Sequence, residues 1–139
     1  MAAVLPAVEA ADALLAAVYD QGGKLLIFGN GGSAADSEHI VGELMKGFTL
    51  PRPVPPAVRQ QLTEAFPENG RYLADHLQGA LPAISLVSQT GLITAFANDV
   101  APDMIFAQQV FGYGRSGDLV WGISTSGNSA NVLHALQVG

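Results

Sequence analysis

The chain of 139 residues has no cysteine and few charged residues. The absence of cysteine excludes disulfides and thiolate chemistry, although it does not by itself fix the cellular compartment. Charged residues make up only 13% of the chain, against 49% hydrophobic residues, which suggests that part of the surface is buried in an oligomer. The net charge is −6 and the six lysines and arginines are scattered, so we expect no direct binding of nucleic acid.

Two further absences concern membranes. No apolar run is long enough to span a bilayer. The first 15 residues lack the basic segment of a secretory signal and contain Glu9 and Asp12. We therefore expect a soluble, cytoplasmic protein that does not bind membranes, with one domain and one core over residues 1–139.

Two loops rich in glycine and serine are the main chemical feature that the sequence does contain. Gly29–Ser33 and Ser124–Ser129 each follow an apolar run and precede a predicted helix. Such loops offer backbone N–H groups, hydroxyls and a helix N-terminus to an anion. Neither loop has the lysine of an ATP-type phosphate loop, and the first lacks the spacing of a dinucleotide fingerprint. A small phosphorylated metabolite is therefore the expected ligand.

Apolar periodicity predicts strands that alternate with helices. The expected strands are 24–28, 83–87 and 118–123. The expected helices are 3–20, 33–48, two short ones within 57–79, 90–98, 102–112 and 129–138. This order predicts an α/β fold with three layers, α/β/α, and a parallel, flavodoxin-like sheet whose carboxyl edge carries both loops. Three strands make a thin sheet, so we expect a partial domain that lacks its last strand and C-terminal helices, or one that borrows structure from a neighbour.

For several polar side chains the sequence leaves two possible roles open. His39 and Glu43 share one helix face, where they form a metal or proton-transfer pair or an ordinary exposed pair. Asp99 either clamps a sugar hydroxyl or caps a turn before Pro102. The hydroxyls of the second loop favour a phosphate cradle over a simple helix cap; they belong to Ser124, Thr125, Ser126 and Ser129.

The remaining histidines and the tryptophan have simpler interpretations. We expect His76 and His134 to be surface or packing residues, and Trp121, in an apolar strand, to lie in the core.

The order and spacing of these motifs resemble the sugar isomerase (SIS) domain family and, within it, the phosphoheptose isomerases. The resemblance covers residues 21–48 and 80–139. Its motifs are Phe28–Asp36, His39 with Glu43 and Leu44, Leu81–Ile84, Leu92–Ala95 with Asn98 and Asp99, and Gly117–Ser129.

The resemblance implies a role for each candidate residue in a sedoheptulose 7-phosphate isomerase. Glu43 is implied as the general base that moves a proton between adjacent carbons of an open-chain ketose phosphate, through an enediol. His39 and Glu43 also match positions that hold zinc in some family members. The implied phosphate and sugar ligands are Ser124, Thr125, Ser126 and Ser129, and Asn30, Gly31, Ser33 and Asp99.

The chain departs from the family pattern in two places. Residues 51–79 form an insertion after the helix that carries Glu43. The family's C-terminal segment, with the glutamine and histidine that complete the acid/base pair and the metal site, is absent, so the chain is similar to a C-terminally truncated isomerase. Two functions therefore remain open: an isomerase, and a non-catalytic SIS module that acts as a phosphosugar sensor or protein scaffold. In either case we expect a homodimer or homotetramer.

Overall fold

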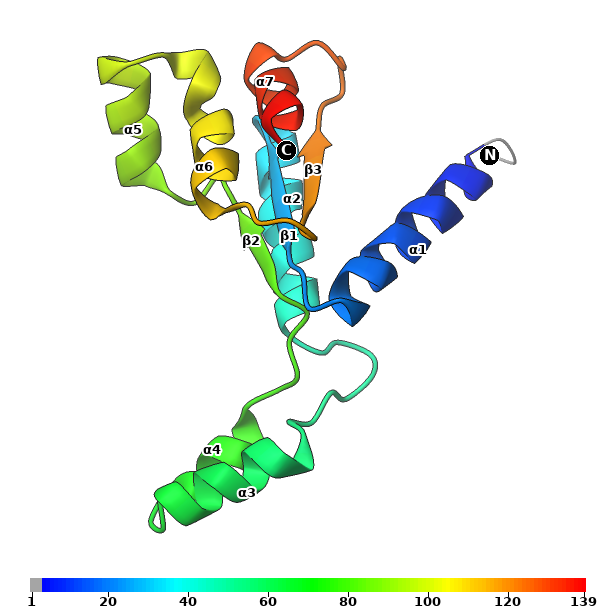
Figure 1. Cartoon of the computed structure of the whole chain (residues 1–139), viewed down its shortest axis with the longest axis vertical. Coiled ribbons are helices and arrows are strands. Elements are labelled where there is room, and N and C mark those ends of the chain that lie inside the picture. Colours follow the sequence, from blue (N-terminus) through cyan, green and yellow to red (C-terminus); the bar gives the residue numbers. More distant parts are fainter. Residues whose placement is uncertain (1–3) are drawn as a thin grey trace. The chain divides into compact units, whose positions relative to one another are not determined.

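The computed structural model describes residues 4–139, which form two compact units (Figure 1). The first unit comprises the chain up to Val41 and from Pro82 onwards, and the second is Gly42–Leu81. The strands of the first unit are β1 (Leu25–Gly29), β2 (Ala83–Ser85) and β3 (Leu119–Ile123). Its helices are α1 (Leu5–Asp20), α5 (Thr90–Asp99), the 3₁₀ turn η1 (Pro102–Met104), α6 (Ile105–Tyr113) and α7 (Ala130–Val138). The helix α2 (Gly32–Met45) starts in the first unit, and the second unit adds α3 (Pro56–Ala65) and α4 (Gly70–His76).

The three strands form one parallel sheet in the order β2–β1–β3. All five residues of the central strand β1 are buried, as a continuous apolar run between two neighbours requires. At the strand starts, Asp118 accepts hydrogen bonds from the backbone N–H and the ammonium of Lys24, at 3.0 and 2.5 Å. The predicted parallel α/β sheet is confirmed.

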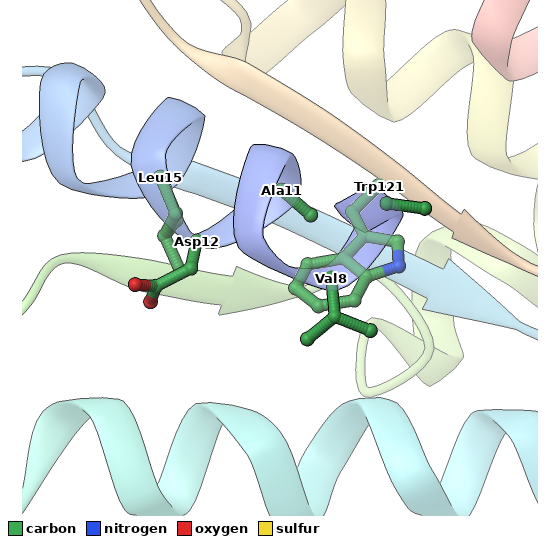
Figure 2. A pocket seen from close by; sticks show the side chains of 6 residues that line it. Val8, Ala11, Asp12, Leu15 and Trp121 are labelled. Atoms are coloured by element: carbon green, nitrogen blue, oxygen red, sulfur yellow. The ribbon is translucent and has the colours of Figure 1, made fainter. Parts of the chain in front are cut away.

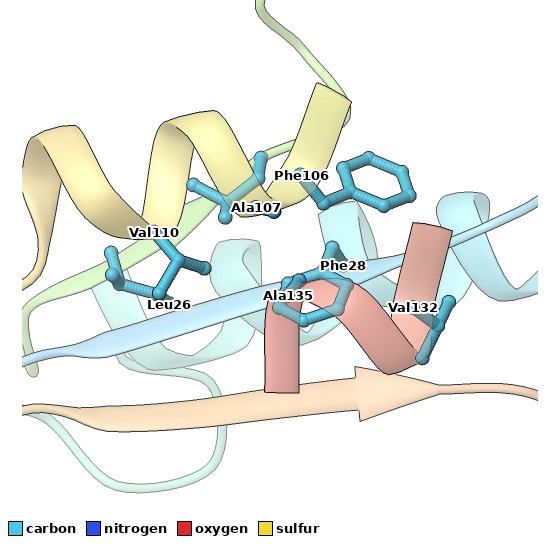
Figure 3. Packing of buried hydrophobic residues seen from close by; sticks show 8 residues of the cluster. Leu26, Phe28, Phe106, Ala107, Val110, Val132 and Ala135 are labelled. Carbon is cyan, nitrogen blue, oxygen red and sulfur yellow. The ribbon is translucent and has the colours of Figure 1, made fainter. Parts of the chain in front are cut away.

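One face of the sheet carries the hydrophobic core. Leu26 and Phe28 of β1 point toward α6 and α7 (Figure 3). The ring of Phe28 stacks on that of Phe106 with centroids 5.1 Å apart. Val110 of α6 and Val132 of α7 fill the same cluster. The two helices are thereby fixed on the strands that lead into the glycine-serine loops.

The opposite face is covered by α2. Ser85 of β2 lies beside Ile27 in register, so both side chains point to this face. The buried hydroxyl of Ser37, on α2, lies 2.9 Å from that of Ser85 and donates to the carbonyl of Ala34. The sheet therefore lies between two helical layers, as predicted.

The helix α1 leaves most of its apolar side chains exposed. Val18 is its one buried residue, whereas Leu5 and Val8 are 60% and 56% exposed. A groove of about 360 Å³ is lined by Ala7, Val8, Ala11, Asp12, Leu15 and Trp121. Figure 2 shows the last five of these side chains, which come from α1 and β3. Trp121 is 38% exposed there, so the prediction that it lies in the core is wrong. The reason is that β3 is an edge strand within the described residues, bordered by β1 on one side only, so its side chains are less covered than those of the central strand β1.

Most helices and strands begin and end within three residues of their predicted bounds. The helix predicted at 33–48 ends at Met45, and the strand predicted at 83–87 ends at Ser85. The helix predicted from Pro102 begins as a 3₁₀ turn and becomes α-helical at Ile105. Residue 3, the predicted start of the first helix, lies outside the described residues. Within residues 4–139, no helix has both the length and the apolarity needed to cross a bilayer.

The second unit is built around the hairpin of α3 and α4. Arg59 of α3 donates a charge-assisted hydrogen bond to Asp75 of α4. Gly70, the buried first residue of α4, lies directly against the backbone of Leu62 in α3. The two short helices predicted within 57–79 are confirmed, while the interpretation of 51–79 as an insertion stays a prediction.

Candidate phosphate and sugar site

The two glycine-serine loops begin side by side. Gly29, the last residue of β1, is paired in register with Ile123, the last residue of β3. Because both strands run in the same direction, the loops that follow them leave the sheet at the same carboxyl edge, which is where parallel sheets place their ligands.

In the loop from β3 to α7, the hydroxyls of Ser126 and Ser129 lie close to that of Ser124. The Oγ atom of Ser124 lies 3.2 Å from that of Ser129 and 3.5 Å from that of Ser126. Gly127 has a φ of +67°, a left-handed conformation that suits glycine and lets the loop turn back on itself. Thr125 is exposed on the same loop. Four hydroxyl groups and a helix N-terminus thus come from six consecutive residues.

The simple helix-cap alternative does not account for this loop. Ser129 occupies the N-cap position of α7, but its side chain makes no capping hydrogen bond. Its hydroxyl instead contacts Ser124. The N–H groups of Gly127 and Asn128 donate to Ser124 Oγ and Ser126 Oγ, at 3.1 and 3.2 Å. The hydroxyls and N–H groups therefore form one network that suits an anion with several oxygens.

An amide pair connects this network to the first loop. The Nδ2 atom of Asn30 donates to Oδ1 of Asn131, and Nδ2 of Asn131 donates to Oδ1 of Asn30, both at 2.9 Å. Asn131 was not among the predicted site residues. The sequence does show that Asn131 is a polar residue in the first turn of α7, next to the serine-rich loop. It does not show the partner of Asn131, because Asn30 lies 101 residues away in the sequence.

The other residues of the first loop are shaped by close packing. Gly31 has a φ of +57°, and the N–H of Ser33 donates to the carbonyl of Asn30 at 3.0 Å. Ser33 is buried against Gly29, where an added Cβ atom would lie 2.6 Å from the Cβ of Ser33. This contact explains why the chain needs glycine at 29 and a small residue at 33.

In the part of the chain that the structure describes, no hydrogen bond or ion pair joins Asp99 to either loop. It is the last residue of α5 and accepts a hydrogen bond from Asn98 at 2.7 Å. The alternative that Asp99 caps the next helix is wrong, because Ala101 holds the N-cap position before Pro102.

His39 and Glu43 lie one turn apart on α2, and both side chains are exposed. Within residues 4–139, neither side chain takes part in a hydrogen bond or an ion pair of the structure. The other histidines contact backbone carbonyls: His76 that of Tyr72, one turn earlier, and His134 that of Asp103, 31 residues earlier.

Comparisons with known proteins show which sequences and structures this chain is similar to. A family model described as the SIS domain matches residues 3–66. The chain is 44% identical over 124 residues to the phosphoheptose isomerase of Chlorobium phaeobacteroides, covering 89% of this chain and 44% of that protein. It is 41% identical over 133 residues to the phosphoheptose isomerase of Citrifermentans bemidjiense, covering 96% and 56%.

Solved structures of phosphoheptose isomerases also superimpose on this chain. The phosphoheptose isomerase of Neisseria gonorrhoeae superimposes with a TM-score of 0.68 at 36% identity, over 97% of this chain and 55% of that chain. The enzyme of Francisella tularensis superimposes with a TM-score of 0.73 at 28% identity, over 96% and 56%. The chain is a homologue of the phosphoheptose isomerases and has their SIS fold. It spans about half the length of these relatives.

Zinc is the metal that the resemblance to phosphoheptose isomerases implies. Zinc sites use three or four protein ligands. Across residues 4–139, no three His, Asp or Glu side chains gather where they could hold one ion. His39 and Glu43 provide two donors from one helix, so the described residues do not complete a zinc site.

Proposed function

We propose that this homologue of phosphoheptose isomerases binds sedoheptulose 7-phosphate and isomerises it. The observation that carries the proposal is the network of Ser124, Ser126 and Ser129 at the N-terminus of α7, joined to the first loop by Asn30 and Asn131. About 40% identity to phosphoheptose isomerases supports the same ligand class. None of the relatives compared above supports the non-catalytic alternative.

The residues divide into three roles. The hydroxyls of Ser124, Thr125, Ser126 and Ser129 bind the phosphate oxygens. Asn30 and Gly31 contact the sugar beside them, with Ser33 supporting the loop and Asp99 as a further sugar ligand. Glu43 is the base that acts on the sugar carbon.

The reaction needs a single proton carrier at carbon. The Glu43 carboxylate removes a proton from the carbon next to the ketose carbonyl, the electron pair of that C–H bond forms the carbon–carbon double bond, and the carbonyl oxygen takes a proton from water, which gives the enediol. Return of the proton from Glu43 to the former carbonyl carbon, with loss to water of the proton on the neighbouring hydroxyl, gives the aldose phosphate. Atoms and electrons balance without an external oxidant, because one carbon is oxidised as its neighbour is reduced.

We further propose that the chain forms a homodimer or homotetramer through α1 and works in the cytoplasm. The exposed apolar residues of α1 and the groove at Trp121 support the assembly, because isolated monomers seldom leave such a surface uncovered.

Two substitutions test the phosphate site by calorimetry with sedoheptulose 7-phosphate. Each hydrogen bond from a neutral hydroxyl to a charged phosphate contributes roughly 1.5–3 kcal/mol, so Ser124→Ala and Ser126→Ala should each weaken binding by roughly 10- to 150-fold. Ser116→Ala removes an exposed hydroxyl outside the loop and should leave the affinity unchanged. Unchanged affinity in both loop variants contradicts the proposed cradle.

The base is tested separately. Glu43→Gln keeps the shape of the side chain and removes its basicity, so turnover should be lost while sugar-phosphate affinity stays nearly the same. Turnover that survives this substitution shows that another group moves the proton.

A further inference from the structure

One arginine holds the end of the helix that carries Glu43. The Nη2 atom of Arg52 donates to the carbonyl of Glu43 at 3.2 Å and to that of Leu44 at 2.9 Å. These carbonyls belong to the last turn of α2, which ends at Met45. Carbonyls of a last turn have no partner within their own helix, and they carry the negative end of the helix dipole. A guanidinium group donates hydrogen bonds to these carbonyls, and its positive charge is attracted to the negative end of the dipole.

The backbone around Arg52 is itself cross-linked. The carbonyl of Arg52 accepts a hydrogen bond from the N–H of Gly79 at 2.6 Å, and Pro53 forms an antiparallel bridge with Gln78. The carbonyl of Leu44 accepts a second bond, from the N–H of Leu81, at 3.0 Å. All of these residues lie within the second unit.

A second side chain completes this arrangement just beyond α2. The Oε1 atom of Gln78 accepts a hydrogen bond from the N–H of Gly47 at 2.7 Å. The two segments that enter and leave the α3–α4 hairpin are therefore bound to each other and to the end of α2. Arg52 is the cationic centre of this brace, which we define as Gly47, Arg52, Pro53, Gln78, Gly79 and Leu81.

The brace acts on the backbone from which Glu43 projects. The Glu43 side chain takes no hydrogen bond within the described residues, so its position depends on its own backbone and rotamer. Arg52 binds the carbonyl of that same residue. A proton-transferring carboxylate must be held close to one geometry, because a displacement of about 1 Å can lower the rate by about 100-fold.

We propose that Arg52 is a positioning residue for Glu43 and that the α3–α4 segment serves the reaction through this contact. The proposal rests on the function proposed above for Glu43. The family resemblance leaves residues 51–79 without a role, and the proposal gives them one, because they fix the end of α2.

The test compares Arg52→Gln and Arg52→Lys with a matched control, Arg59→Gln. Arg59 lies in the same unit and pairs with Asp75, so its loss disturbs the hairpin without touching α2. Turnover of sedoheptulose 7-phosphate gives kcat and KM, and hydrogen exchange followed by mass spectrometry reports on residues 42–50.

We expect Arg52→Gln to lower kcat by about 10-fold or more, with little change in KM, and to speed exchange over residues 42–50. Arg52→Lys keeps a cation with several donors and should restore part of kcat. Arg59→Gln should speed exchange in α3 and α4 only, with kcat unchanged. A kcat that stays at the wild-type value in Arg52→Gln, or a change confined to KM, overturns the positioning role.

Wild-type protein and Glu43→Gln, assayed alongside, separate the two proposals. Turnover that depends on Glu43 but not on Arg52 overturns the positioning role alone. The absence of any turnover that depends on Glu43 overturns the proposed base, and the positioning role with it.

Discussion

Asp118 joins the starts of two neighbouring strands through a single carboxylate. Its side chain is 7% exposed and accepts hydrogen bonds from the Lys24 ammonium and from the backbone N–H groups of Lys24 and Arg115. Burial alone raises the pKa of this carboxyl, but the bond from the Lys24 side chain and the two backbone bonds outweigh burial. The pKa of Asp118 therefore lies below its ordinary value of 3.8.

This lowered pKa predicts a pH-dependent contribution to stability. Because the folded pKa lies below the unfolded one, the stabilisation is fully present above about pH 4 and is lost as the pH falls through the folded pKa. Asp118→Asn should lower the free energy of unfolding by about 1.5–3 kcal/mol at pH 7. Urea unfolding at several pH values should show the gap between wild type and variant closing below pH 4. A gap that is constant from pH 7 to pH 3 contradicts this account.

Individual site residues differ in how far the sequence predicts them. Ser124, Ser126 and Ser129 lie within one short loop, so their hydroxyls must be neighbours, and the structure brings them together. Asn131 pairs with a residue 101 positions away, which only the parallel register of β1 and β3 makes adjacent. Trp121 looks like core by type, but its burial depends on what covers β3.

At the scale of elements, α3 and α4 approach each other at a glycine. A Cβ atom on Gly70 would collide with the carbonyl group of Leu62 and the Cα of Thr63, and none of these backbone atoms can rotate away. The N–H of Gly70 also donates to the carbonyl of Phe66 at 2.7 Å. The absence of a side chain at this position sets the spacing of the two helices.

Gly70→Ala should therefore loosen the hairpin. Overpacking against backbone costs about 1–3 kcal/mol, and hydrogen exchange of the α3 and α4 amides should speed up accordingly. Gly112→Ala is the matched control, because a methyl group there meets nothing within 4 Å and alanine is the better helix former. Unchanged exchange in α3 and α4 of Gly70→Ala contradicts the collision.

The periodicity of the sequence predicts the elements better than their ends. The continuous apolar run at 24–28 indicates a strand buried on both faces, and β1 is the central strand. The end of α2 is three residues earlier than periodicity suggests. There the deciding contacts come from Arg52 and Leu81, which the local pattern does not contain.

At the scale of the whole molecule, α1 carries the exposed apolar surface on which the proposed assembly rests. Leu5, Val8 and Leu14 are each more than half exposed, on a helix with two acidic residues before Asp20 and no basic ones. Low charge over the whole chain predicts such a surface, but which helix carries it depends on how α1 packs.

The assembly is tested by light scattering with Val8→Lys. Wild-type protein should be a dimer or tetramer at micromolar concentration, because the exposed α1 residues gain from burial. Val8→Lys places a charge in that contact and should shift the protein toward monomer, while its circular dichroism stays unchanged because Val8 is 56% exposed. Gln137→Lys adds the same charge on α7 as a control. A wild-type monomer contradicts the assembly.

The internal bonding of the β3–α7 loop has a consequence for how it selects its ligand. The N–H groups of Gly127 and Asn128 already donate to serine hydroxyls, so an incoming phosphate replaces these bonds rather than adding to them. The number of hydrogen bonds is nearly conserved, and the gain comes from exchanging a neutral acceptor for a charged one. A phosphate monoester takes its second negative charge near pH 6. If the loop binds phosphate as proposed, affinity should therefore rise with the ionisation of the sugar phosphate itself, and we expect dianions to bind more tightly than monoanions.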